Sequence, residues 1–478
     1  MGLIDAYLFC DNKTALDVAV NLARWFYDWS GKFTREKFNE ILDVETGGML
    51  EMWAELYGIT GESFIKELID RYYRTNLFDP LLDGKDVLTN MHANTTIPEV
   101  MGAARAYEVT GDKKWFDIIV AYWNMAVTER GTYATGGQTC GEIWSPPNAL
   151  SARLGDKNQE HCTVYNMMRL AEFLFRHTGE VCYCDYWELN LYNGIMAQAY
   201  WKGNASHGLD NNHPDRGLLT YFLPLRSGAR KGWSSETEDF FCCHGTLVQA
   251  NASFTEGLYY QDEKSVSICQ YFASTAKFDL NDSDITIKLE IDQQAGNKNV
   301  SSVQNRAQSI SEVTSVVHHN PDLLAVDLDI KCEKKSEFTL RIRVPQWNKG
   351  YKIYLDGKEI IDPVISKGFI EITHCWHNNK VRYEVKKALT LSMLPDENQT
   401  YAFMYGPIVL AGLCTNEYIL YGNADEPDRI LIPDNEREWG MWQNTFRTRG
   451  QYMGFKFIPL NKVGYEPYTV YFPIRPEK

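Results

Sequence analysis

A short phrase recurs along the first half of the chain and limits how this part can fold. It consists of an aromatic residue, two variable positions, Thr-Gly and an acidic residue, and it occupies residues 57–62, 107–112 and 175–180. A degenerate copy occupies residues 7–12. Gly suits the left-handed position that ends a helix, and an acidic residue suits the start of the next one. Each copy therefore predicts the boundary between two helices.

The stretches beside these phrases have the periodicity of amphipathic helices. They cover residues 13–29, 62–74, 113–127 and 182–200, and residues 164–174 have the apolar spacing of an inner helix. Helical hairpins that return at intervals of about 50 to 70 residues are typical of an α/α solenoid or a closed α/α toroid. We therefore expect residues 1–261 to form an α/α-toroid domain that carries the chemistry.

The pattern changes near residue 262, where short alternating segments replace the helical spacing. Strands are expected at Asp284–Glu290, Leu324–Ile330, Phe338–Val344, Lys352–Leu355, Phe369–Thr373 and Val381–Val385. Asp356-Gly357 predicts a tight hairpin. We expect an antiparallel β-sandwich over residues 262–400 and an additional β segment over 401–478 that packs back on the body.

Composition restricts the partners of the chain. A net charge of −15 over 478 residues argues against nucleic acid or an anionic membrane as the main partner. No apolar run is long enough for a transmembrane helix. The eleven cysteines are odd in number and irregularly spaced, which does not fit a disulfide framework. This favours a reducing, cytoplasmic location with some thiols used as ligands.

Two pairs of residues predict a metal site. Glu160 and Cys162 precede an expected helix, and so do the adjacent Cys242 and Cys243. Zn²⁺ takes thiolate and carboxylate ligands in tetrahedral sites, so these residues could form a Cys₃Glu centre. The alternative is that these are ordinary buried cysteines, since free Cys is among the most buried residue types. Cys182-x-Cys184 is a competing pair, which we interpret as part of a packed helix.

Several other polar residues are candidates for acid–base or binding roles. Glu142 lies on a glycine-rich loop before Trp144, where an aromatic wall would raise its pKa and make it a general acid; the alternative is a surface glutamate. His92 could donate to a substrate hydroxyl or cap a helix. Glu188 is either on a solvated face or turned inward among aromatic residues. A further acidic motif, Glu45-x-Gly47-Gly48-Met49-x-Glu51, lies on a tight turn.

Taken together, these motifs resemble glycoside hydrolase family 127 along nearly the whole chain and in the same order. The matching segments are Gly136-Gly137 with Gly141-Glu142, Glu160-His161-Cys162, Leu191-Tyr192-Asn193-Gly194, Phe241-Cys242-Cys243, residues 340–347 and residues 405–412. The resemblance implies an (α/α)₆ barrel followed by β-sandwich domains. It implies release of β-L-arabinofuranose, or a related L-sugar, from plant-type glycans with retention of configuration.

The resemblance also assigns roles to particular residues. It implies zinc held by Glu160, Cys162, Cys242 and Cys243, with Cys242 also acting as the nucleophile. Glu142 takes the role of the acid/base. The residues expected to contact sugar hydroxyls are His92, Glu188 and Tyr221.

One departure from the family is expected at the N-terminus, where relatives carry further helices and this chain begins within the helical pattern. The barrel is therefore expected to be incomplete there. Two alternatives to the glycosidase function are kept. They are an inactive or carbohydrate-binding remnant of the same fold, and a non-hydrolytic sugar epimerase or lyase. The expected partner is an oligosaccharide or glycoside, and a homodimer is left open.

Overall fold

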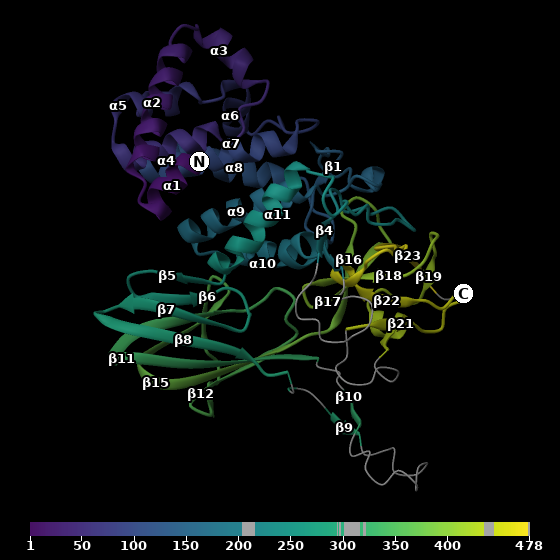
Figure 1. The fold of residues 1–478 in the computed structure, drawn as a ribbon. Helices are drawn as coiled ribbons and strands as arrows, with labels where there is room; N and C mark the ends of the chain where they lie inside the picture. The colour runs from purple at the N-terminus through teal and green to yellow at the C-terminus, as the bar shows by residue number, and fades with distance from the viewer. Residues whose placement is uncertain are drawn as a thin grey trace. The chain divides into compact units, whose positions relative to one another are not determined.

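The computed structural model describes residues 1–202, 216–293, 295, 298–300, 316–318, 322–434 and 444–476. Helices dominate up to residue 257 and strands dominate beyond it, which confirms the predicted order of a helical part followed by sheets (Figure 1). The chain divides into two compact units, Met1–Tyr133 with Gly137–Phe173 and Ala134–Gly136 with Leu174–Lys478. Closure of the helices into a six-hairpin barrel, and its incompleteness, stay predictions.

The helical elements follow one another with short connections as far as Thr128. They are α1 (Gly2–Cys10), α2 (Lys13–Ser30), α3 (Arg35–Leu42), α4 (Met49–Thr60), α5 (Ser63–Arg71), α6 (Thr75–Leu82), α7 (Ala93–Thr110), α8 (Lys113–Trp123), η1 (Asn124–Thr128), η2 (Ser151–Arg153), α9 (His161–Thr178), α10 (Val181–Asn190), η3 (Leu191–Ile195), α11 (Cys242–Ser253) and η4 (Phe254–Gly257). A helix is present in each range expected from the repeated phrase, but the one expected over 182–200 ends at Ile195, and Ala199–Lys202 form a strand.

The glycines of the phrase end helices as predicted. Gly61, Gly111 and Gly179 have φ angles of 67°, 69° and 69°, in the left-handed region. In the degenerate copy Asp11 takes this conformation with a φ of 51°. The acidic residue of the phrase then occupies the N-cap of the next helix, as Asp112 does when its side chain accepts from the Lys114 N–H.

The threonine of the phrase has a role that the sequence did not reveal. The Thr60 hydroxyl donates to the Leu56 carbonyl at 2.8 Å and accepts the Glu62 N–H at 3.4 Å. The same pair of contacts recurs around Thr110 and Thr178. Each threonine therefore binds a carbonyl at the end of one helix and an N–H at the start of the next.

The helical unit is held together by close packing of inner faces. Helix α4 packs against α7 with Gly102 at the contact, where an added Cβ would lie 2.6 Å from the Leu50 Cβ. In α9 the side chains that carry the predicted apolar spacing are all at most 5% exposed, which confirms that face: Val164, Met167, Met168, Leu170, Ala171 and Leu174.

The described strands before and within the middle of the chain are β1 (Thr139–Cys140), β2 (Ile143–Trp144), β3 (Ala199–Lys202), β4 (Arg216–Leu219), β5 (Tyr259–Gln261), β6 (Ser265–Ile268), β7 (Ser274–Leu280), β8 (Ser283–Ile291), β9 (Lys298–Val300), β10 (Val316–His318), β11 (Leu323–Arg343), β12 (Tyr351–Leu355), β13 (Lys358–Glu359), β14 (Val364–Ser366) and β15 (Phe369–Lys386). A nine-stranded sheet has the order β13-β12-β15-β11-β6-β5, with β14, β7 and β8 off this path.

Four of the expected strands are in fact parts of two long strands, which lie side by side in Figure 1. Residues 324–330 and 338–344 both belong to β11, and residues 369–373 and 381–385 both belong to β15. The two strands stay paired through a register shift between Lys331 and Ser336. The sequence predicted separate strands on either side of this stretch, but the register shift ends neither β11 nor β15. The Asp356-Gly357 hairpin is confirmed, with φ angles of 48° and 79° between β12 and β13.

The remaining strands form a second sheet. They are β16 (Leu389–Met393), β17 (Thr400–Tyr405), β18 (Ile408–Gly412), β19 (Leu420–Tyr421), β20 (Leu431–Pro433), β21 (Phe446–Thr448), β22 (Lys456–Pro459) and β23 (Tyr471–Arg475), with α12 (Pro427–Ile430) and η6 (Leu460–Lys462) between them. Strand β16 lies within residues 262–400, the range predicted for the β-sandwich. It pairs with β17 and so belongs to this second sheet. The domain boundaries at 261 and 400 stay predictions.

The C-terminal segment contacts the loop that precedes α11. The buried Lys231 ammonium donates to the carbonyls of Leu460 and Val463 at 2.8 and 2.9 Å. The Tyr468 hydroxyl donates to the Pro224 carbonyl at 2.6 Å. Among the described helices, none has the length and apolar character needed to cross a membrane.

Candidate active site and metal centre

Glu142 lies at the tip of a tight hairpin between β1 and β2. Gly141 and Glu142 form its two-residue loop, with φ angles of 64° and 69°. Positive φ at both positions defines a type I′ turn, which glycine adopts readily and glutamate only at a cost. The left-handed conformation costs a non-glycine residue about 1–2 kcal/mol. Such strain is retained mainly where the side chain must point in one direction, often at a functional site.

Backbone pairing places His92 beside this hairpin. His92 forms a β-bridge with Ile143, the Ala93 N–H donates to the Glu142 carbonyl at 2.8 Å, and the Trp144 N–H donates to the Met91 carbonyl at 3.0 Å. The His92 Nε2 and Glu142 Oε2 atoms are consequently 3.7 Å apart, and both side chains are partly exposed. Trp144, the expected aromatic wall, is fully buried, and its Nε1 donates to the Thr96 hydroxyl at 3.0 Å.

The same hairpin is joined to the segment that leads into α9. The Gly141 N–H donates to the Lys157 carbonyl at 2.8 Å, and the Gln159 N–H donates to the Thr139 carbonyl at 3.2 Å. Gln159 has a φ of 48° and is fully buried against Gly137, where an added Cβ would lie 2.6 Å from the Gln159 Oε1. The glycine-rich loop thus fixes the backbone immediately before Glu160.

The first pair of expected metal ligands lies at the start of α9. Glu160 precedes the helix and Cys162 is in its first turn. Each is 1% exposed. A carboxylate and a thiol buried together at a helix start are expensive to desolvate unless a positive partner balances them.

The second pair opens α11. Cys242 is exposed and Cys243 is fully buried, and their sulfurs are 3.9 Å apart. The Tyr221 hydroxyl lies 3.5 Å from the Cys242 Sγ. His244, in the first turn of α11, accepts the Phe241 N–H on its Nδ1 at 2.8 Å and so caps the helix.

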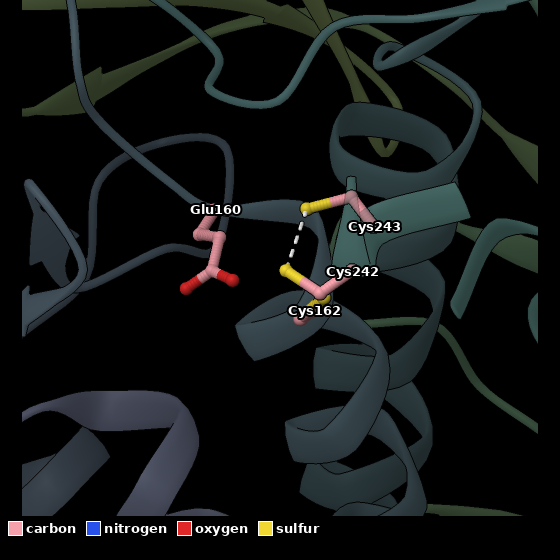
Figure 2. Close-up of side chains that lie close together, drawn as sticks. All are labelled: Glu160, Cys162, Cys242 and Cys243. Carbon is pink, nitrogen blue, oxygen red and sulfur yellow. Dashed lines mark hydrogen bonds between the residues drawn. The ribbon is translucent and has the colours of Figure 1, made fainter. Parts of the chain in front are cut away.

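The structure brings the four expected ligands together. The ligand atoms of Glu160, Cys162, Cys242 and Cys243 all lie within 4.8 Å of one another (Figure 2). Zn–S bonds of 2.3 Å in a tetrahedron require sulfurs about 3.8 Å apart, close to the 3.9 Å between Cys242 and Cys243. Three thiols and one carboxylate at this spacing fit a zinc ion. Cys182 and Cys184 are not part of this cluster, and Cys184 is buried in a small core with Phe175 and Cys269.

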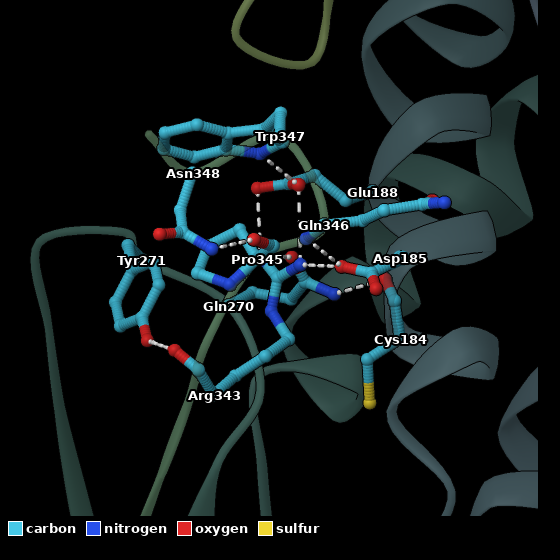
Figure 3. A network of polar contacts seen from close by, with 10 residues as sticks. All are labelled: Cys184, Asp185, Glu188, Gln270, Tyr271, Arg343, Pro345, Gln346, Trp347 and Asn348. Atoms are coloured by element: carbon cyan, nitrogen blue, oxygen red, sulfur yellow. Dashed lines mark hydrogen bonds and ion pairs between the residues drawn. The ribbon is translucent and has the colours of Figure 1, made fainter. Parts of the chain in front are cut away.

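Glu188 lies in a buried ion pair. It is 5% exposed and binds the fully buried Arg343 of β11 through both oxygens, at 2.7 and 3.2 Å (Figure 3). The Trp347 Nε1 also donates to it, at 2.8 Å. Asp185, one turn earlier, pairs with Arg343 at 2.6 Å. Glu188 is thus held by Arg343 and Trp347, and its expected contact with a sugar hydroxyl stays a prediction.

Sequence reasoning missed the partners of these residues. Arg343 is 155 positions from Glu188, and nothing in the local pattern marked it as the counter-charge. Thr95 contacts His92, and Glu45 contacts Thr95. The sequence did not indicate either contact, although Glu45 lies in the acidic motif noted above. Partners this far apart in the sequence become visible only when the fold is known.

Comparisons with known proteins identify the class of this protein. Residues 1–256 match a family model described as "Beta-L-arabinofuranosidase, GH127 catalytic domain", and residues 265–386 match "Beta-L-arabinofuranosidase, GH127 middle domain". The catalytic-domain match alone covers more than half of the chain, so the protein is a glycosidase. The chain belongs to glycoside hydrolase family 127, as its motifs indicated. Comparison with curated protein sequences gave no match.

Solved structures support the same fold. A GH127 β-arabinofuranosidase is 16% identical, with a TM-score of 0.70, over 99% of this chain and 75% of that one. A structure described as a glycoside hydrolase is 17% identical, with a TM-score of 0.72, over 97% and 80%. A GH127 β-L-arabinofuranosidase from Geobacillus stearothermophilus T6 is 16% identical, with a TM-score of 0.64, over 89% and 72%.

Proposed function

We propose that this protein is a retaining glycosidase that releases β-L-arabinofuranose, or a related L-sugar, from plant-type glycans. Cys242 is the nucleophile and Glu142 is the acid/base. Family membership and the glycosidase class support the substrate type. The observation that carries the mechanism is the difference within the cysteine pair: Cys242 is exposed and Cys243 is buried, so only Cys242 can meet a substrate.

The four clustered side chains are proposed to hold one zinc ion. When bound, Zn²⁺ would keep the cysteine sulfurs deprotonated near neutral pH and so supply a thiolate nucleophile. Cys242 is also the first residue of α11, where the helix N-terminus favours negative charge. The Tyr221 hydroxyl, 3.5 Å from the Cys242 sulfur, can donate to it or to a sugar bound beside it.

The reaction then proceeds in two displacements. In the first, the Cys242 sulfur attacks the anomeric carbon, the bond from this carbon to the glycosidic oxygen breaks, and Glu142 gives its proton to that oxygen. In the second, Glu142 removes a proton from water, the water oxygen attacks the same carbon, and the carbon–sulfur bond breaks. Two inversions give net retention. His92, 3.7 Å from Glu142, lies where it can also contact a sugar hydroxyl.

The test is hydrolysis of an aryl β-L-arabinofuranoside by the zinc-loaded protein under reducing conditions. Proton NMR of the first product should show β-L-arabinofuranose. Cys242→Ala should lower kcat by about 10³-fold or more, because the nucleophile is lost. Cys375→Ala is the matched control, since Cys375 is an exposed thiol on β15, and it should leave kcat unchanged.

Glu142→Gln separates the acid role from binding. This change should slow glycosides with poor leaving groups far more than an aryl glycoside, whose leaving group needs little protonation. Equal losses on both substrates would contradict the acid role. Zinc-loaded, folded wild-type protein without turnover on L-arabinofuranosides and related L-glycosides would overturn the proposed activity and favour a carbohydrate-binding remnant.

A further inference from the structure

The His92 ring, which faces Glu142 on one side, is hydrogen-bonded on the other. Its Nδ1 lies 2.7 Å from the Thr95 hydroxyl oxygen. That hydroxyl lies 2.9 Å from the Glu45 Oε1. Glu45, Thr95, His92 and Glu142 therefore form a continuous chain of polar contacts that ends at the proposed acid/base.

The number of protons available determines which group donates and which accepts at each of these contacts. An ionised carboxylate can only accept, so the single Thr95 proton goes to Glu45. The Thr95 oxygen must then accept from His92, which places a proton on Nδ1. In the neutral ring the other nitrogen, Nε2, is left as an acceptor directed at Glu142, 3.7 Å away.

The loop that carries Glu45 is itself held in place. Asp43, two residues earlier, binds the Arg74 Nε at 2.8 Å and the Asn76 amide at 2.5 Å. Arg74 in turn pairs with the buried Glu99 at 3.0 Å. Thr95 is 5% exposed, so its hydroxyl has little access to water as an alternative partner. The carboxylate of Glu45 is therefore presented to Thr95 by a fixed backbone.

We propose that Glu45 is a positioning residue for the acid/base, acting through Thr95 and His92. By holding the proton on Nδ1, it makes neutral His92 an acceptor toward Glu142. The Nε2 atom is then the part of the ring that lies nearest the Glu142 carboxylate. This inference rests on the proposed role of Glu142, but its effect on the His92 ring does not depend on turnover.

Loss of Glu45 should release this tautomer. In Glu45→Gln the amide can donate or accept, so the Thr95 hydroxyl can turn toward His92 and leave the proton on Nε2. The ring would then present a donor on the side of Glu142, where the wild-type ring presents an acceptor. We expect kcat to fall by about tenfold, with KM within twofold.

The decisive measurement is the tautomer of His92, read from two-bond ¹H–¹⁵N correlations of ¹⁵N-histidine-labelled protein and assigned with His92→Gln. Wild type should show Nδ1–H in the neutral ring. Glu45→Gln and Thr95→Val should show Nε2–H or a mixture, and Thr95→Ser should restore Nδ1–H. Glu40→Gln, whose carboxylate pairs with Lys37 instead, is the control and should match wild type.

An Nε2–H tautomer in wild type, or a tautomer insensitive to Glu45→Gln, would overturn the proposal. The expected tautomers in a protein that hydrolyses no L-arabinofuranoside would leave the positioning of His92 intact and reject the proposed function instead. The expected tautomers with an unchanged kcat in Glu45→Gln would overturn the link from His92 to Glu142.

Discussion

The Arg343 guanidinium binds both carboxylate oxygens of Glu188, with Nη2–Oε1 at 2.7 Å and Nη1–Oε2 at 3.2 Å. The arginine comes from β11 and the glutamate from α10, so one ion pair joins a helix to the long strand of the nine-stranded sheet. Burial raises the pKa of the neighbouring Asp185, and Arg343 opposes this rise. The guanidinium is thus the counter-charge of two buried carboxyl groups.

Arg343→Met should destabilise the protein by about 3–5 kcal/mol, because it leaves Glu188 and Asp185 buried without a counter-charge. Urea unfolding of the zinc-loaded protein measures this loss. Lys380→Met is the control, since the Lys380 side chain is 81% exposed in its pair with Asp329 and should change stability by less than about 0.5 kcal/mol. Adding Glu188→Gln to Arg343→Met should recover part of the loss; a fully additive double variant would mean that the pair does not interact.

Gly137→Ala should weaken both the fold and metal binding. The new methyl would lie 2.6 Å from the Oε1 and 2.9 Å from the Cβ of buried Gln159, the residue before Glu160. Overpacking of this kind costs roughly 1–3 kcal/mol, and the shift should reach the Glu160 carboxylate. Thermal unfolding and zinc titration measure the two effects. Gly155→Ala in the same loop meets only an ordinary contact, 3.8 Å from the Arg153 carbonyl oxygen, so an equal effect there would refute the steric argument.

Cys162→Ser should reduce zinc from about one ion per chain to a small fraction, because a serine hydroxyl is a much poorer zinc ligand than a thiolate. Elemental analysis of protein purified in the presence of zinc provides the measurement. Cys375→Ser removes an exposed thiol outside the cluster and should leave the zinc content unchanged. Stable wild-type protein that carries no zinc would contradict the assigned metal site.

Glu142→Gly should make the protein more stable while abolishing turnover. The φ of 69° at Glu142 strains a residue with a Cβ, and glycine removes that strain. Glycine also gains freedom in the unfolded chain, so the net gain should be roughly 0.5–1 kcal/mol. Glu142→Gln keeps the strain and should show no gain. Equilibrium unfolding of both variants distinguishes them, and a destabilised glycine variant would argue that the side chain itself holds the hairpin.

The stability of the protein should fall across the neutral range because of Glu99. Burial raises the pKa of Glu99 to about 7 from its ordinary 4.5, against the opposing pull of Arg74. The folded state therefore holds this proton more tightly than the unfolded state. Its contribution to stability is fully present below about pH 4.5 and is lost as the pH rises through about 7. Melting temperatures between pH 5 and 8 should decline less in Glu99→Gln; equal slopes would show that Glu99 does not titrate in this range.

The sequence by itself determined the features that depend on neighbouring residues. The repeated phrase predicted its helix ends because the left-handed C-cap and the acidic N-cap are properties of a few consecutive residues, as Gly61 and Asp112 confirm. The Asp356-Gly357 hairpin was predicted for the same reason. The family motifs correctly indicated the glycosidase family, and the ligand types at Glu160, Cys162, Cys242 and Cys243 predicted a cluster that the structure contains.

Only the tertiary structure decided which distant groups meet. It paired Glu188 with Arg343 across 155 positions, linked Thr95 to Glu45 across 50, and buried Trp144 in the helical core. It also continued β11 and β15 through a register shift where separate strands were expected. These outcomes depend on how packed elements exclude water and supply partners to buried charges, and such energies arise between segments that are remote in the sequence.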